Sequence, residues 1–142
     1  MNKLLWSFHV LLTLTFVVFG LQKVFFPIPD LIDQGMLWIE DFTAWQVRAI
    51  GALEVIGALG LNLPYLVKRL PKVFVPLAAA GLALTMVGGA LTHIVRGDPA
   101  PSIVITSLLV VMGAVLAIAR FRQITQTGAT TFGAELPAVE AA

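Results

Sequence analysis

The sequence contains no cysteine and few charged residues, and each of these absences excludes a class of protein. Without cysteine the chain cannot form disulfides, thiolate zinc sites or cysteine-bound iron–sulfur clusters, and it cannot act as a thiol–disulfide oxidoreductase. Only 12% of its residues are charged and 58% are hydrophobic, whereas a typical soluble domain has about 25% charged residues. Such an apolar chain exceeds what a small water-soluble core can hide, so the composition indicates a membrane protein.

Motifs of catalysis and of nucleic-acid binding are also missing. No basic patch alternates with aromatic residues, so nothing favours a nucleic-acid partner. The sequence has no nucleophile–base pair, no metal-ligand set and no phosphate-binding loop. We therefore expect no metal site, no intrinsic cofactor and no enzymatic activity by this chain alone.

Four apolar segments are each long enough to cross a hydrocarbon core of about 30 Å, which requires roughly 20 helical residues. They cover about residues 4–26, 45–66, 73–95 and 101–121. Prolines and glycines separate them into helices with mostly short connections, and helices joined in this way must be antiparallel neighbours. The predicted fold is all-α, an integral membrane four-helix bundle over residues 1–122.

The distribution of lysine and arginine predicts the orientation of this bundle. One end collects only basic residues until Glu135, namely Lys3, Lys68, Arg69, Lys72, Arg120 and Arg122. At the other end, basic residues are offset by acidic ones. We expect the basic end, with both the N- and C-termini, to be cytoplasmic.

Two segments outside the predicted spans follow from this orientation. Residues 27–44 form an extracytoplasmic loop, for which the sequence leaves two alternatives. Its apolar residues suit a short helix on the membrane surface or over the bundle mouth, and its acids suit a flexible connector. Residues 123–142 are small and polar, so we expect a flexible cytoplasmic tail.

The most informative polar residue is Glu54, which lies nine positions after Trp45 and hence about 13–14 Å along its helix. An ionised carboxylate near the bilayer midplane requires a cation, or else it stays protonated. The other helices bring further polar residues to the same half of the bundle. The predicted pocket in the outer half comprises Glu54, Arg48, Lys23, His93, Gln22 and Thr106. It would bind a head group or pass a proton; the alternative is a buried ion-pair network that fixes helix register.

The partner of Glu54 is not determined by the sequence. Arg48 is six residues away, about 120° around the helix axis, so Lys23 or His93 is an alternative partner. His9 lies near the opposite end from His93, roughly 20 Å away in depth, which excludes a haem held by both histidines of this chain.

Three short motifs follow one another in the predicted spans. They are Gly20-x-x-Lys23 in the first, Arg48-x-x-Gly51-x-x-Glu54-x-x-Gly57 in the second, and His93 near the end of the third. In these motifs and in its topology, the chain resembles the DoxX-like family of small bacterial and archaeal membrane proteins over about residues 4–122. The resemblance implies a four-helix bundle in the plasma membrane of a bacterium or archaeon.

The resemblance also implies a functional setting. The DoxX-like family takes its name from a small subunit of an archaeal terminal quinol oxidase, and related proteins are linked to thiosulfate–quinone oxidoreduction. This chain would then be an accessory membrane protein of a quinone-linked oxidoreductase or respiratory complex, with a bound quinone or lipid and with membrane lipids and other membrane subunits as partners. The alternatives are a non-catalytic assembly subunit of a larger complex, or a small carrier of a lipophilic molecule or proton.

Overall fold

The computed structural model describes the backbone of residues 2–134 and the side chains of residues 3–127. Its element order is α1 (Asn2–Phe25), α2 (Ile28–Asp33), the 3-10 helix η1 (Leu37–Asp41), α3 (Ala44–Leu66), α4 (Phe74–Arg96) and α5 (Ala100–Ala134). The described part of the chain has no strand. Four of these helices are long and apolar enough to span a membrane, as predicted.

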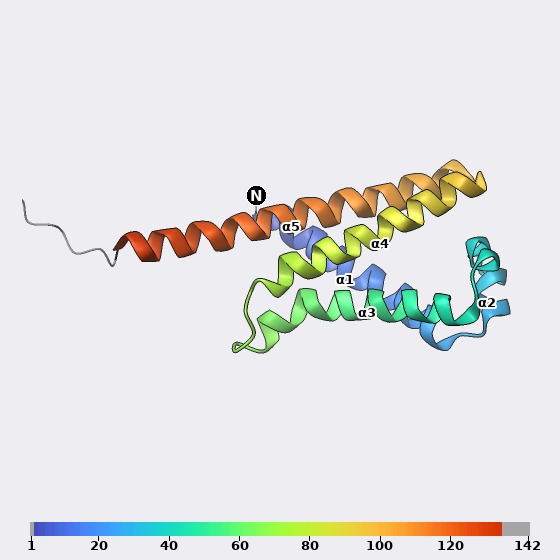
Figure 1. The fold of residues 1–142 in the computed structure, drawn as a ribbon, viewed down its shortest axis with the longest axis horizontal. Coiled ribbons are helices and arrows are strands. Elements are labelled where there is room, and N and C mark those ends of the chain that lie inside the picture. Colours follow the sequence, from blue (N-terminus) through green and yellow to red (C-terminus); the bar gives the residue numbers. More distant parts are fainter. Residues whose placement is uncertain (1, 135–142) are drawn as a thin grey trace, which may run out of the picture.

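The four long helices run lengthwise in the bundle (Figure 1), and their contacts close a ring in the order α1, α3, α4, α5. The α4–α5 and α1–α3 pairs have the most extensive contacts, α3 also packs on α4, and α1 closes the ring against α5. We call the end that carries α2 and η1 the capped end, and the end with the α3–α4 connection and the N-terminus the basic end. The predicted antiparallel bundle is confirmed, whereas its orientation in the membrane stays a prediction.

A narrow apolar core holds the ring together. Its buried members include Leu12 and Phe16 of α1, Leu61 of α3, Leu82 of α4 and Leu116 of α5. Most other large apolar side chains point outward and stay exposed in the isolated chain, as Leu84 does at 72%. In water such a surface would be unstable, but acyl chains cover it at no cost, so the exposed faces fit a lipid environment.

Residues 27–44 fold into a small cap. Pro27 precedes α2, and Thr43 starts α3 with a capping box in which its backbone N–H and hydroxyl both donate to the Gln46 side chain. Leu31 of α2, Ile39 of η1 and Val47 of α3 bury each other in a second apolar cluster. Of the two alternatives for this segment, the structure therefore has the short helix and not the flexible connector.

The fourth long helix differs from its predicted bounds. We expected a helix to about residue 121 and a tail from residue 123, but α5 continues as a helix to Ala134. No proline interrupts the sequence between residues 102 and 136, and Thr125 satisfies its hydroxyl by donating to the backbone of Phe121 and Arg122. The rest of the predicted tail, residues 135–142, lies outside the described residues.

Candidate functional site

A close helix crossing brings the predicted polar residues together. Gly20 of α1 and Gly51 of α3 lie so near each other that a Cβ on Gly51 would be 2.7 Å from the Gly20 carbonyl oxygen and 2.6 Å from the Lys23 Cβ. Only glycine fits at such a distance. The crossing therefore sets the register in which Lys23, one turn after Gly20, faces Glu54, one turn after Gly51.

Lys23 and Glu54 form a buried ion pair at this crossing. The Lys23 ammonium donates to both Glu54 carboxylate oxygens, at 2.7 Å to Oε2 and 2.9 Å to Oε1. The two residues are only 7% and 1% exposed. Lys23, and not Arg48, is therefore the hydrogen-bonded partner of Glu54, and the two charges neutralise each other inside the bundle.

Arg48 and Gln22 do not take part in the Lys23–Glu54 ion pair. The Arg48 guanidinium donates to the backbone carbonyl of Lys23, so it braces the last turn of α1 from α3. Gln22 has a buried side-chain oxygen that finds no hydrogen-bond partner among residues 3–127. Neither residue lines the cavity described next, although both were predicted to belong to the pocket.

A cavity of about 460 Å³ lies inside the ring, in the half towards the capped end. All four long helices and the η1 segment contribute to its wall. Its apolar wall includes Phe16, Phe19, Trp38, Phe42, Met86 and Leu109, and its polar lining includes Lys23, Glu54, Thr85, Thr92, His93 and Thr106. Four of the six predicted site residues, Glu54, Lys23, His93 and Thr106, therefore border one cavity of ligand size.

Aromatic rings surround the ammonium of Lys23. Its Nζ lies 5.9 Å from the centre of the Phe19 ring and 5.8 Å from that of Trp38. Both distances are within the range of cation–π attraction. Trp38 also packs edge-to-face on Phe42, with ring centres 5.4 Å apart. The cap thus contributes Trp38 and Phe42 to the cavity wall, and the Trp38 ring lies near its charged ammonium.

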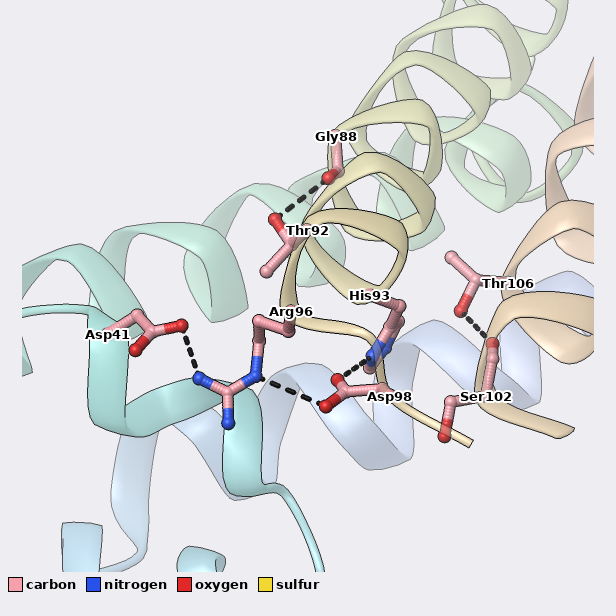
Figure 2. A network of polar contacts seen from close by, with 8 residues as sticks. All are labelled: Asp41, Gly88, Thr92, His93, Arg96, Asp98, Ser102 and Thr106. Carbon is pink, nitrogen blue, oxygen red and sulfur yellow. Dashed lines mark hydrogen bonds and ion pairs between the residues drawn. The ribbon is translucent and has the colours of Figure 1, made fainter. Parts of the chain in front are cut away.

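His93 is held at the capped end by a chain of charged groups (Figure 2). Its Nδ1 lies 2.6 Å from Asp98 Oδ2, and Arg96 donates from Nε to the other Asp98 oxygen at 3.3 Å. Arg96 also donates from Nη1 to Asp41 of η1. Because Nδ1 is occupied by Asp98, Nε2 is the His93 nitrogen that remains for a ligand in the cavity.

The Asp98 carboxylate is kept ionised by these contacts. The hydrogen bond from His93 is the main cause that lowers the pKa of Asp98 below its ordinary value, and Arg96 adds to it against the opposing effect of desolvation. Gly97 ends α4 in the left-handed region, with φ 71°, and the Asp98 N–H then donates to the His93 carbonyl. This turn returns Asp98 to the side of His93.

The threonines of the wall have their hydroxyls partly satisfied within their own helices. Thr92 donates to the Gly88 carbonyl and Thr106 to the Ser102 carbonyl, both visible in Figure 2. Thr85 likewise donates to Gly81. Their oxygens can still accept a hydrogen bond, so they offer weak polar contacts on an otherwise apolar wall.

Sequence reasoning missed the residues that close the cavity and orient His93. Trp38 and Phe42 are among the apolar residues for which the sequence offered a short helix over the bundle mouth, but nothing in the sequence indicated that these two line a cavity. The sequence placed Asp98 with Gly97 in a tight reversal and counted it as a charge of the predicted outer side, but it did not show that this reversal brings Asp98 back to His93. Within the described residues, no group of three or more histidine, aspartate or glutamate side chains is arranged to hold a metal ion.

Comparison with known proteins agrees with the fold. No curated protein and no solved structure matches the chain. A sequence model of the DoxX-like family matches residues 7–119, which cover the second and third spans completely, most of the first and fourth, and every residue of the site. This four-span membrane protein therefore belongs to the DoxX-like family.

Proposed function

We propose that this protein is an accessory membrane protein of a quinone-linked oxidoreductase or respiratory complex, and that it binds a quinone in the cavity beneath the cap. The observation that carries the proposal is the buried Lys23–Glu54 pair facing a cavity of about 460 Å³ with aromatic residues in its wall. Ligand sites are typically apolar spaces of about 300–1,000 Å³ with a few placed polar groups. A quinone head matches this pattern because it is a flat apolar ring with carbonyl acceptors.

The polar groups of the cavity can form hydrogen bonds to a quinone ring and can exchange protons with it. An ammonium has three N–H donors, and the Glu54 oxygens take two of those on Lys23, so the third remains for a quinone carbonyl. His93 offers Nε2 from α4. When a partner oxidoreductase supplies two electrons to the quinone, two protons must follow. The Lys23 ammonium, and not the ionised Glu54, carries one of them, and a doubly protonated His93 ring would supply the other from Nε2.

A second candidate function is that of an assembly subunit that binds no ligand. The same crossing of α1 and α3 supports it. The tight Gly20–Gly51 contact and the Lys23–Glu54 pair would then only fix helix register. The broad exposed apolar faces of the bundle would pack against other membrane subunits.

Quinone binding by paired variants separates the two functions. We expect purified protein in mild detergent to bind a short-chain ubiquinone or menaquinone, and Glu54→Gln to weaken binding about tenfold or more because a charged hydrogen-bonding group is lost. Glu54→Gln alone also leaves Lys23 buried without its counter-ion, which costs about 3–5 kcal/mol of stability.

The double variant Lys23→Met with Glu54→Gln is the matched control, because it removes that unpaired charge. It should recover thermal stability while still failing to bind quinone. If the wild type binds no quinone, and these variants change only the amount of co-purifying membrane subunits, the assembly function is the correct one.

A further inference from the structure

A second polar cluster lies towards the basic end, about two turns into α1, and it has no part in the proposed quinone site. His9 is only 1% exposed. Its Nε2 lies 3.3 Å from Asn62 Oδ1, while the Asn62 amide nitrogen donates to the Thr13 hydroxyl at 2.9 Å and to the Ala58 carbonyl at 2.7 Å. Since the Asn62 oxygen can only accept, His9 Nε2 is the donor. The neutral imidazole then presents Nδ1 as an acceptor, and this buried atom has no partner among the residues that the structure describes.

Aromatic rings and one cation surround this histidine. The Trp6 and Tyr65 ring centres lie 5.0 Å and 5.5 Å from that of His9 and 5.2 Å from each other. The Arg120 guanidinium of α5 lies over Trp6, at 5.1 Å from the ring centre, and it is near enough for its charge to act on His9. Trp6 and Tyr65 are 42% and 41% exposed, so the cluster reaches the surface of the bundle.

The guanidinium of Arg120 has an unused pair of donors. Its Nη1 donates to the Gln123 side chain at 3.1 Å, whereas Nε and Nη2 are buried and have no hydrogen-bond partner in the described part of the chain. These two nitrogens form the side-on fork with which arginine binds two oxygens of a phosphate or carboxylate. No carboxylate pairs with Arg120 among the side chains that the structure describes. A buried charged group without a hydrogen-bond partner costs free energy, and a ligand at Arg120 would remove that cost.

The charges around the cluster indicate the kind of ligand. Lys3, Lys68, Arg69, Lys72 and Arg122 share the basic end with Arg120, and all five are exposed. Through the described residues this end carries no acidic side chain. Clusters of this composition beside a membrane span attract anionic head groups. Trp6 and Tyr65 are the residue types that typically mark the interface where head groups lie.

We propose that Arg120, Trp6 and His9 form a binding site for a phosphate group, carried by the head group of an anionic membrane lipid or by a free phosphate compound. The Arg120 fork binds two phosphate oxygens after its side chain turns from Trp6 towards the surface. His9 Nδ1 accepts a hydrogen bond from a head-group hydroxyl, and Trp6 and Tyr65 form the wall. The site is separate from the cavity at the capped end.

Native mass spectrometry on the full-length protein in mild detergent tests this site. The probes are phosphatidylglycerol, the zwitterionic phosphatidylcholine and inorganic phosphate. We expect phosphatidylglycerol to bind more tightly than phosphatidylcholine, and Arg120→Gln to weaken its binding about tenfold or more, as loss of a charged hydrogen bond predicts. Arg122→Gln is the matched control, because it removes the same charge from an exposed position two residues along α5.

The arms of this experiment distinguish the sources of phosphate. If inorganic phosphate displaces the lipid in the wild type but not in Arg120→Gln, the ligand is a free phosphate compound. If only the lipid binds, the head group is the ligand. Arg120→Lys keeps the charge without the fork and should bind with intermediate affinity, which gives a second reading if Arg120→Gln fails to fold. Equal loss of binding in Arg120→Gln and Arg122→Gln, or no loss in either, would overturn the proposal.

Discussion

At the scale of single residues, Lys23 and Glu54 are buried where neither charge would be stable without the other. Each residue is nearly fully buried, and the ammonium contacts both carboxylate oxygens. Buried pairs often add little net stability compared with apolar residues of the same volume, because desolvation offsets their attraction. Their presence beside an open cavity therefore has a better explanation in ligand binding than in stability alone.

The Asp98 carboxylate at the capped end makes a prediction about pH. Because contacts with His93 and Arg96 lower its pKa in the folded protein, its contribution to stability is present at neutral pH and is lost as the pH falls through that lowered pKa. We expect Asp98→Asn to release Arg96 and His93 already at pH 7, and so to loosen η1.

The fluorescence of Trp38 measures this effect in a background where Trp6 and Trp45 are phenylalanine. The emission of the wild-type protein should shift only in acid below the ordinary range of aspartate, about 3.9, whereas Asp98→Asn should show shifted emission at every pH. Identical Trp38 emission in the two proteins at pH 7 would mean that Asp98 does not position the cap.

At the scale of helices, the crossing of α1 and α3 depends on the absence of a side chain at Gly51. In Gly51→Ala the new methyl would lie 2.6 Å from the Lys23 Cβ and 2.7 Å from the backbone oxygen of Gly20, so the two helices must separate. We expect a loss of about 1–3 kcal/mol, as for other overpacked sites, together with weaker quinone binding because Lys23 moves away from Glu54.

Gly81→Ala on α4 is the control for this substitution, since a Cβ there meets nothing within 4 Å. It should leave thermal unfolding in detergent unchanged or slightly improved, because alanine favours a helix more than glycine does. If both alanine variants unfold at the wild-type temperature, the helices do not depend on the Gly20–Gly51 contact.

The helices and their contacts also differ in how far the sequence could predict them. The four spans follow from apolar length and proline punctuation, and those rules are local. The choice of Lys23 over Arg48 as the partner of Glu54 depends on how closely α1 approaches α3. The resemblance motifs contained both Gly20 and Gly51, but spacing along one chain gives no distance between two helices. The extension of α5 past residue 121 was missed because polar composition was taken as loss of helix, although no proline ends it there.

At the scale of the whole molecule, the two ends of the bundle differ in charge and in structure. The capped end combines Arg96 with Asp41 and Asp98 in one network, whereas the basic end has cations without acidic partners among its described side chains. In the positive-inside rule, lysine and arginine in short loops select the cytoplasmic side. The cap and the proposed quinone cavity would then lie towards the outer leaflet, and the proposed phosphate site towards the inner one.

Single-cysteine labelling tests this orientation, and the absence of native cysteine makes the readout specific. Gln34→Cys, in the exposed turn after α2, should react with a membrane-impermeant maleimide in intact cells or spheroplasts. Val67→Cys, exposed just after α3, should react only after the membrane is permeabilised. The reverse pattern would place the cap in the cytoplasm, and it would assign the Arg120 cluster to the outer leaflet. Both substitutions replace uncharged residues that lie outside the spans. They therefore change neither the number of charges nor the helix packing on which the predicted orientation depends.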